Sequence, residues 1–323
     1  MRLLILGYSS IAERRVIPAA SKVAAIDEIS IASKGRPQPN DWPKAGRFFT
    51  DYRTALHESG SDTVYVSLPN SMHEQFVMMA LAAGKHVIVD KPGMITLEAS
   101  ERAVNEARRT SRVLAEATVF GYHPQFKMLA DFVTENGPLI CVDAQFIIPP
   151  LPIANFRNSR ELGGGCLLDM GPYAAGVIRL LGGGSPSHIM GLVGNLHPET
   201  GVDMGFSVQA RLSNGGIFSG HFSFDGEYQN RLLVVARSGS VIIERVFTPP
   251  ADHKTEWRRR VRNVESAVTF EVADTFALFL ESVARAVASG DHEGLHRNLL
   301  DDAECRERIA KALLNREPAQ QCL

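Results

Sequence analysis

The segment GGGCLLDMGPY, from Gly163 to Tyr173, places a carboxylate and a phenol four residues apart behind three glycines. We expect a helix here with Pro172 in its first turn, where a missing N–H costs little because those donors have no intrahelical partner. Asp169 and Tyr173 then lie one turn apart on one face, near the helix N-terminus. The helix dipole, together with a nearby lysine, would bring the tyrosine pKa down toward the range of acid-base catalysis. The alternative is a glycine-rich helix start that Asp169 caps and in which Tyr173 is half buried.

A second candidate is GYSSIA (7–12), which follows an apolar run and precedes a helical pattern. The dinucleotide fingerprint is G-x-G-x-x-G/A, and this chain has Gly7, Ser9 and Ala12 at its three fixed positions. The Cβ of Ser9 would hold a pyrophosphate away from the backbone, although its hydroxyl could donate a compensating hydrogen bond and the helix N-terminus favours an anion. An ordinary turn between a strand and a helix is the alternative.

The end of the next strand carries Ser33, Lys34 and Arg36. An acidic residue there would bind the adenosine ribose of NAD, whereas a hydroxyl and two cations suit a 2′-phosphate. These residues therefore predict NADP as the cofactor, with NAD possible as the alternative. Two exposed loop cations without a ligand would give the same pattern.

The elements that must position these residues alternate between strand and helix over the first 117 residues. Apolar runs predict strands at 2–7, 28–34, 63–69, 86–92 and in RVLAEAT, and helical patterns follow at SSIAERRVIPAASKV, 52–59, 72–84 and LEASERAVNEARRTS. This order predicts an α/β domain, a Rossmann-type doubly wound parallel sheet over residues 1–118.

After residue 118 the pattern changes to a helix near 125–136 and several turn-separated strands. They are DMGFSVQARLS, GIFSGHFSF, NRLLVVARS and SVIIERVFT, and the closing helices are DTFALFLESVARAVAS and DDAECRERIAKALLN. The sequence thus predicts a second, α+β domain over residues 119–323 with a largely antiparallel sheet, for substrate binding and oligomerisation.

Composition excludes several classes of function. The formal net charge of −2 provides no basic field for a nucleic acid or an anionic membrane. The four cysteines form no C-x-x-C pair and the histidines lack H-x-x-x-H or H-E-x-x-H spacing, so we expect neither a disulfide framework nor a metal site. The opening run LLILG is too short for a signal sequence, and eighteen consecutive apolar residues occur nowhere. We expect a cytoplasmic protein.

The segment VSLPNSMHEQFVMMALAAGKHVIVDKPGMIT (66–96) is more specific. It resembles the P-N-x-x-H…A-L-x-x-G-K-H-V-x-x-E-K-P pattern of the glucose-fructose oxidoreductase and inositol dehydrogenase (Gfo/Idh/MocA) family, with Asp90 in place of the usual Glu. LGGGCLLDMGPY is similar to the family's G-G-G-x-L-x-D-x-G-x-H segment, with Tyr173 where many members have His. The resemblance extends over nearly the whole chain.

This resemblance implies an NAD(P)-dependent oxidoreductase in which Lys91, Asp169 and Tyr173 are catalytic. An ammonium at the carboxyl end of a parallel strand can polarise a substrate oxygen and stabilise the negative charge that develops on it. The expected cofactor-binding residues are Gly7, Ser9, Ser10, Ile11, Ala12, Ser33, Lys34, Arg36, Ser67, Leu68, Pro69, Asn70, His73, Asp90, Lys91 and Pro92. The expected substrate-binding residues are Lys91, His123, Arg157, Arg160, Asp169 and Tyr173.

A narrower resemblance concerns SSIAERRVIPA (9–19), PPLPIANFRNSRELGGG (149–165) and ERVFTPP (244–250), which look like nucleotide-sugar 3-ketoreductases. Arg157 and Arg160 would then suit the substrate diphosphate, or else they are solvated loop arginines. The leading hypothesis is hydride transfer between the nicotinamide and a sugar hydroxyl or ketone, in particular a nucleotide-linked keto-deoxysugar. The alternatives are a dehydrogenase of a free sugar, inositol or diol, and a non-catalytic NADP-binding sensor. The resemblance also implies a homo-oligomer, either a dimer or a tetramer.

Overall fold

The computed structural model describes residues 1–314 of the chain, and these form two compact units. Unit 1 consists of Met1–Tyr122 together with Asp274–Leu300. Unit 2 consists of His123–Ala273 and the chain from Asp301 onward. In the described part of the chain, no helix combines the length and apolar character needed to cross a membrane.

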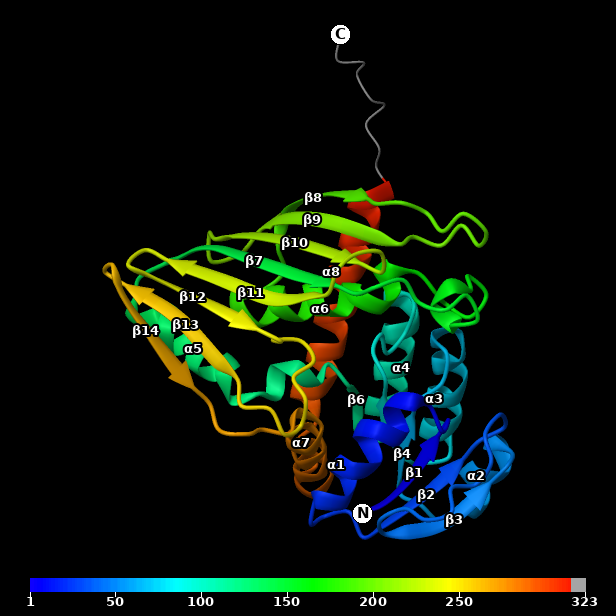
Figure 1. The fold of residues 1–323 in the computed structure, drawn as a ribbon. Coiled ribbons are helices and arrows are strands. Elements are labelled where there is room, and N and C mark those ends of the chain that lie inside the picture. Colours follow the sequence, from blue (N-terminus) through cyan, green and yellow to red (C-terminus); the bar gives the residue numbers. More distant parts are fainter. Residues whose placement is uncertain (315–323) are drawn as a thin grey trace. The chain divides into compact units, whose positions relative to one another are not determined.

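Unit 1 is built on a six-stranded parallel sheet in the order β3-β2-β1-β4-β5-β6 (Figure 1). Its strands are β1 (Arg2–Leu6), β2 (Glu28–Ala32), β3 (Ala45–Phe49), β4 (Thr63–Val66), β5 (His86–Val89) and β6 (Leu114–Glu116). The order runs outward from β1 in both directions, which confirms the predicted doubly wound sheet. The edge strand β3 has no counterpart among the predicted strands.

Helices cover both faces of this sheet. They are η1 (Ala12–Val16, a π-helical turn), α1 (Ile17–Lys22), α2 (Tyr52–Glu58), η2 (Asn70–Met72, 3-10), α3 (His73–Ala82), α4 (Leu97–Arg109), η3 (Val119–Tyr122, 3-10) and α7 (Thr275–Ser289). Because side chains alternate along a strand, Leu3 and Ile5 of β1 pack with α1 and α7, whereas Leu4 and Leu6 pack with α2, α3 and α4.

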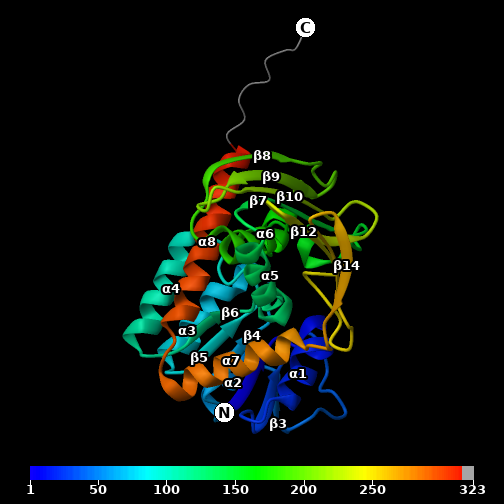
Figure 2. The ribbon, with the colours of Figure 1, turned by 90° about the vertical axis from the view of Figure 1, so that its left-hand side faces the viewer.

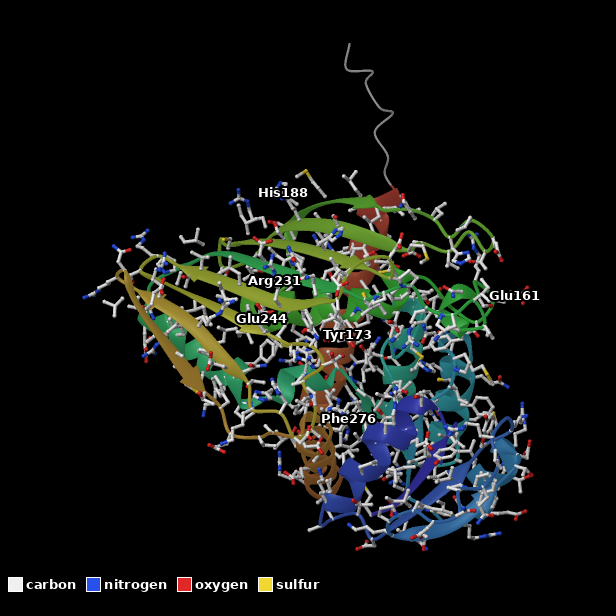
Figure 3. All side chains as sticks on the ribbon, in the orientation of Figure 1. Glu161, Tyr173, His188, Arg231, Glu244 and Phe276 are labelled. Atoms are coloured by element: carbon white, nitrogen blue, oxygen red, sulfur yellow. The ribbon has the colours of Figure 1, made fainter. Side chains whose placement is uncertain are left out.

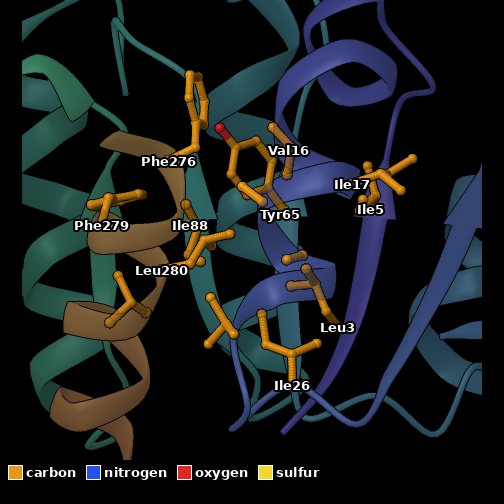
Figure 4. Packing of buried hydrophobic residues seen from close by; sticks show 14 of the residues in the cluster. Leu3, Ile5, Val16, Ile17, Ile26, Tyr65, Ile88, Phe276, Phe279 and Leu280 are labelled. Atoms are coloured by element: carbon orange, nitrogen blue, oxygen red, sulfur yellow. The ribbon is translucent and has the colours of Figure 1, made fainter. Parts of the chain in front are cut away.

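Helix α7 belongs to unit 1 although it lies far along the chain. Its residues Phe276, Phe279 and Leu280 pack in one core with Tyr65 and Ile88 (Figure 4). The expected domain boundary assigns this helix to the second domain, because sequence position alone does not reveal which sheet buries its apolar face. Helix α8 (Glu293–Leu314) starts in unit 1, and its residues from Asp301 onward belong to unit 2.

Unit 2 contains an eight-stranded sheet in the order β14-β13-β12-β11-β7-β10-β9-β8. Its strands are β7 (Leu139–Ile147), β8 (Ser187–Val193), β9 (Gly205–Arg211), β10 (Ile217–Ser223), β11 (Gln229–Ala236), β12 (Gly239–Glu244), β13 (Glu256–Val261) and β14 (Val264–Thr269). Among the described strands of this second sheet, only β7 and β10 pair in parallel, so the prediction of a largely antiparallel sheet is confirmed.

The two faces of this second sheet differ. Helices α5 (Pro124–Glu135) and α6 (Cys166–Gly182) lie on one side of it, and α6 packs against β9 and β10 (Figure 2). Along β9, Phe206 and Val208 are buried toward the helices while Gln209 is exposed on the other face. Met190 and Leu192 of β8 are 65% and 75% exposed. A short 3-10 helix, η4 (Phe156–Asn158), precedes α6.

Candidate active site

The turn after β1 requires glycine at its first position. Gly7 has φ +98°, and a Cβ there would overlap the carbonyl oxygen of Ser67 at the end of β4. The close approach of these two strand ends therefore depends on a residue without a side chain. The turn leads into the π-helical η1, a rare conformation that recurs at functional sites.

Ser9, which stands where the fingerprint has its second glycine, is engaged within the protein. Its hydroxyl lies 2.7 Å from the Ser67 hydroxyl, and its Oγ accepts a hydrogen bond of 3.0 Å from the backbone N–H of Ala12. These contacts use the hydroxyl that we expected to donate to a pyrophosphate. Ser9 thus caps the start of the helix from inside the turn.

The three residues after β2 are held by local contacts. Ser33 is buried and its Oγ accepts from the backbone N–H of Arg36 at 3.0 Å. The Arg36 guanidinium lies 4.3 Å from the centre of the Tyr8 ring and donates to Glu13 at 2.9 Å. The bond from Arg36 is the main cause that holds the Glu13 pKa below its usual value, and the Tyr8 hydroxyl adds to it.

Lys34, in the same loop, is exposed and pairs weakly with a neighbouring carboxylate. Its Nζ lies 3.7 Å from the carboxylate of Asp51 and 5.2 Å from the centre of the Tyr52 ring. Lys34 and Arg36 therefore present two cations at the strand end where the ribose of a dinucleotide binds in this fold. Together with the Gly7 turn, they form a cradle that fits NADP.

Lys91 follows β5 and is half buried. The peptide bond between Lys91 and Pro92 is cis. The preceding carboxylate, Asp90, accepts two hydrogen bonds of 2.6 Å, one from the Tyr65 hydroxyl and one from the Ser67 hydroxyl. Burial is the main cause that raises the pKa of Tyr65 well above its ordinary value, and the Asp90 charge and hydrogen bond raise it further. Asp90 is thus fixed by the strand that lies beside its own.

His73 holds the loops after β4 and β5 together. Its ring is fully buried, and each ring nitrogen lies 2.8 Å from a backbone carbonyl oxygen, one of Leu68 and one of Pro92. Asn70 is also buried, in η2 between these loops. The expectation that His73 binds the cofactor stays a prediction, and in the structure both ring nitrogens lie beside backbone carbonyl oxygens.

Helix α6 begins earlier than Pro172 suggests. It begins at Cys166, with Gly165 as N-cap at φ +109°, so Asp169 lies in the first turn and Pro172 inside the helix. The prediction of Pro172 in the first turn is therefore wrong. The cause is a partner far along the chain: Asp203 accepts from the N–H of Leu167 at 2.6 Å through its carboxylate, and from that of Cys166 at 2.8 Å through its carbonyl.

Asp169 is 7% exposed and forms an ion pair with Arg157 at 2.9 Å. The Arg157 guanidinium also lies over the Phe156 ring, 4.7 Å from its centre. In this structure Arg157 thus forms an ion pair with the predicted catalytic carboxylate of Asp169. Arg160, the other expected diphosphate ligand, is exposed and donates to the carbonyl of Gly201 at 3.0 Å.

Tyr173 lies one helical turn beyond Asp169 and is partly exposed (Figure 3). The rings of Tyr173 and Phe146 contact each other edge to face, with their centroids 5.0 Å apart. The rings of Tyr173 and Phe247 are tilted relative to each other, with their centroids 5.2 Å apart. Phe247 belongs to ERVFTPP, one of the segments noted in the sequence. The aromatic packing fixes the ring that would carry the catalytic hydroxyl.

His123 is buried at the start of α5. It is 2% exposed, its Nδ1 accepts from the N–H of Gln125 at 3.2 Å, and it thereby caps α5. Burial lowers its pKa to about 4. The expectation that His123 binds substrate stays a prediction, and in the structure the ring is a buried helix cap.

Two groups of predicted residues come together, one in each unit. Unit 1 joins the Gly7 turn to Asp90, and unit 2 places Arg157, Asp169 and Tyr173 on or beside the start of α6. The sequence analysis missed Tyr65, Glu13 and Asp203, for which no motif gives a signal. Among residues 1–314, no group of three His, Cys, Asp or Glu side chains is placed to hold a metal ion.

Comparison with known families gives two matches. Residues 1–118 match the oxidoreductase family with an NAD-binding Rossmann fold. Residues 134–242 match the GFO/IDH/MocA C-terminal domain. Together these matches extend over more than half of the chain.

Individual relatives are similar over most of their length. The chain is 32% identical to a dTDP-3,4-didehydro-2,6-dideoxy-alpha-D-glucose 3-reductase from Saccharopolyspora spinosa, covering 90% of this chain and 88% of that one. It is 30% identical to the enzyme of the same name from Actinomadura kijaniata, covering 90% and 89%. A solved 3-ketoreductase from Actinomadura kijaniata, in complex with NADP and TDP-benzene, is 26% identical, with a TM-score of 0.88 and coverage of 97% and 98%.

Proposed function

Because this chain belongs to the GFO/IDH/MocA oxidoreductase family, we propose that it reduces the 3-keto group of a dTDP-linked keto-deoxysugar with NADPH. Its 32% identity to a 3-reductase of such a sugar, over 90% of the chain, carries this choice of substrate. This reaction is more specific than the oxidoreductase activity that family membership establishes. Arg157, Asp169 and Tyr173 support it by supplying an ion-paired carboxylate and a fixed phenol.

NADPH, when bound, supplies the hydride that reduces the keto carbon. The Gly7 turn and the cations of Lys34 and Arg36 would hold it, because the turn admits a close backbone approach and the cations suit a 2′-phosphate. Ser33, which begins this loop, adds a buried hydroxyl rather than a carboxylate. This donor set favours NADPH over NADH.

The side chains of the protein supply the proton and the charge stabilisation. Tyr173 donates a proton to the carbonyl oxygen, which becomes the product hydroxyl. Lys91 stabilises the negative charge that develops on this oxygen. Asp169, held by Arg157, orients either the phenol or the neighbouring sugar hydroxyl. A general acid contributes about 10² to 10⁴ in rate, so removal of the Tyr173 hydroxyl is expected to lower kcat by that order.

The test is turnover of a freshly generated dTDP-3-keto-deoxysugar with NADPH, compared with free sugars, inositols and diols oxidised with NADP. We expect rapid NADPH consumption only with the nucleotide-linked ketone, and loss of this activity in Tyr173→Phe with NADPH affinity unchanged. Faster turnover of a free sugar would favour the sugar dehydrogenase alternative. Tight NADP binding without turnover of any of these compounds would favour the sensor.

We also propose that two copies associate through the exposed face of the unit 2 sheet. Met190 and Leu192 expose large apolar areas there beside a hollow of about 530 Å³ that Gln145, Gln209 and His221 also line. Light scattering is expected to give at least a dimer, and Leu192→Asp a monomer with an intact fold. A wild-type monomer at micromolar concentration would contradict this.

The cysteines favour a reducing compartment, and we propose the cytoplasm. Cys141, Cys166 and Cys305 carry free thiols, and burial is the main cause that raises the pKa of Cys305 to about 12, which keeps this thiol protonated and unreactive. A tagged chain is expected in the cytosolic fraction of lysed cells. Recovery in a secreted or membrane fraction would contradict this.

A further inference from the structure

We propose that Ser9 is a positioning residue that couples the cofactor turn to Lys91 through Ser67 and Asp90. The inference rests on the proposed function in one respect, the catalytic use of Lys91. Ser9 occupies the position where the dinucleotide fingerprint has a glycine, so the usual account of this position is steric. The hydrogen bonds of the chain assign it a different role.

Three hydrogen bonds form a continuous path from the cofactor turn to Asp90, the residue before Lys91, and a fourth bond reaches Asp90 from Tyr65. The N–H of Ala12 donates to Ser9 at 3.0 Å, the hydroxyls of Ser9 and Ser67 lie 2.7 Å apart, and Ser67 donates to Asp90 at 2.6 Å. The Tyr65 hydroxyl donates to the other oxygen of Asp90, also at 2.6 Å.

Counting protons gives this path a single direction. A serine hydroxyl has one proton to donate. Ser67 gives its proton to the Asp90 carboxylate, so the bond between the two serines is donated by Ser9. The Oγ of Ser9 is then free to accept from the N–H of Ala12. Each donor is used once, and all of them point toward Asp90.

The middle of the path is shielded from water. Tyr65 is fully buried and Ser67 is 3% exposed, whereas Ser9 and Asp90 at the two ends are partly exposed. The bonds that Ser67 and Tyr65 make to Asp90 are therefore stronger than they would be in water. The backbone N–H of Asp90 also donates to the carbonyl of Val66 at 3.0 Å, which continues the β4–β5 pairing up to Lys91. Both the backbone and the carboxylate of Asp90 are thereby fixed, and the backbone of Lys91 follows directly from this fixed residue.

The two accounts of Ser9 predict opposite results for Ser9→Gly. If the serine is only an imperfect glycine, the change restores the fingerprint, tightens NADPH binding and leaves kcat unaltered. If Ser9 positions Lys91, the change leaves Ser67 without its donor and Ala12 without its acceptor, and kcat falls. Loss of one bond in a network around a charged group is expected to lower kcat by about tenfold.

The experiment compares Ser9→Gly, Ser9→Thr, Ser67→Ala and the Ser9→Gly/Ser67→Ala double variant, with Ser21→Ala as control. Ser21, on α1, donates its hydroxyl to the carbonyl of Pro18 in the same helix, so its removal controls for hydroxyl loss. Kinetics with the keto-sugar give kcat, KM and the pH profile, and fluorescence titration gives the NADPH dissociation constant. Ser67→Ala carries the test if Ser9→Gly unfolds.

A second readout does not require a substrate. The pH dependence of Lys91 modification by an amine-directed acylating reagent, followed by peptide mass spectrometry, reports the surroundings of Lys91 directly. We expect Ser9→Gly and Ser67→Ala to shift this profile similarly, the double variant to be no worse than either single one, and Ser9→Thr to restore it.

An unchanged Lys91 profile with unchanged kcat in Ser9→Gly would overturn the proposal, as would tighter NADPH binding without a loss in kcat. If the wild-type protein fails to reduce the keto-sugar, the proposed function fails. The labelling profile of Lys91 still decides the role of Ser9 in that case.

Discussion

The proposed preference for NADPH depends on Arg36, which already has an anionic partner. It pairs with Glu13 at 2.9 Å, and both side chains are 42% exposed. An ion pair this exposed contributes little to stability because solvent screens it, so an arriving phosphate can displace it. Glu13 nevertheless competes with the 2′-phosphate for Arg36 and repels its charge.

We therefore expect Glu13→Gln to tighten NADPH binding by about threefold, the factor that corresponds to such a pair, and to leave NADH binding unaltered. Fluorescence titration of both cofactors measures this. Arg36→Ala serves as the control, because it should lose the preference for NADPH over NADH. Weaker NADPH binding in Glu13→Gln would mean instead that the carboxylate holds Arg36 in its productive position.

At this scale the sequence predicts residue types better than their partners. The motif containing His73 was identified, but spacing alone does not tell whether a ring faces a ligand or two carbonyl groups. The same holds for His123, a helix cap, and for Arg157, which pairs with Asp169. These contacts depend on segments that are distant in the chain and that no local pattern specifies.

The start of α6 depends on a residue outside the helix. Gly165 provides no side-chain cap, and Asp203 supplies the missing acceptor to the N–H of Leu167. Burial is the main cause that raises the Asp203 pKa above its ordinary value. As pH rises from that ordinary value through the raised one, the native state holds a proton that the unfolded chain has lost, so this group's contribution to stability declines.

We expect Asp203→Ala to lower the free energy of unfolding by about 1 to 2 kcal/mol, the usual cost of losing a cap, and to lower kcat because the first turn carries Asp169. Asp203→Asn retains an acceptor and should lose less. Thermal unfolding and keto-sugar kinetics measure the two effects. Normal kcat in a destabilised Asp203→Ala protein would restrict its role to folding.

Sequence periodicity predicted most of the elements that hold the site, because the buried strands β1, β4 and β5 are continuous apolar runs. It did not predict β3, AGRFF, which pairs only with β2 at the sheet edge and contains a glycine and an exposed arginine. Nor did it predict β13, whose EWRRRV sequence has three consecutive arginines on exposed backbone. β3 is an edge strand and β13 lies next to the edge strand β14, so backbone pairing fixes both more than a continuous apolar run does.

At the scale of the whole molecule, each unit contains a buried histidine that weakens it in acid. The pKa values of His296 in unit 1 and His123 in unit 2 are both lowered to about 4, mainly by burial. Between pH 6.5 and 4 the unfolded chain binds protons that the native rings do not. The stability is therefore complete above the ordinary pKa and lost as pH falls, by up to about 3 kcal/mol per histidine.

We expect the free energy of unfolding to fall steadily from pH 7 to pH 4.5, and His123→Asn, which keeps a capping side chain, to make this slope shallower. Urea unfolding at fixed ionic strength measures both. An identical slope in the variant would show that the His123 ring titrates alike in the folded and unfolded chains.

The proposed chemistry also requires two residues that are far apart in the chain, Lys91 and Tyr173, to act on the same substrate oxygen. Tyr173→Phe removes the proton donor and is expected to lower kcat by about 10² to 10⁴, and Lys91→Ala should be at least as damaging because it removes the charge that stabilises the developing alkoxide. Residues that act as a unit on one atom lose their contribution together, so the double variant should be far less impaired than the product of the two single losses.

Single-turnover reduction at saturating NADPH measures all three variants. Losses that multiply in the double variant would assign Lys91 and Tyr173 to separate steps and remove the shared oxygen from the mechanism.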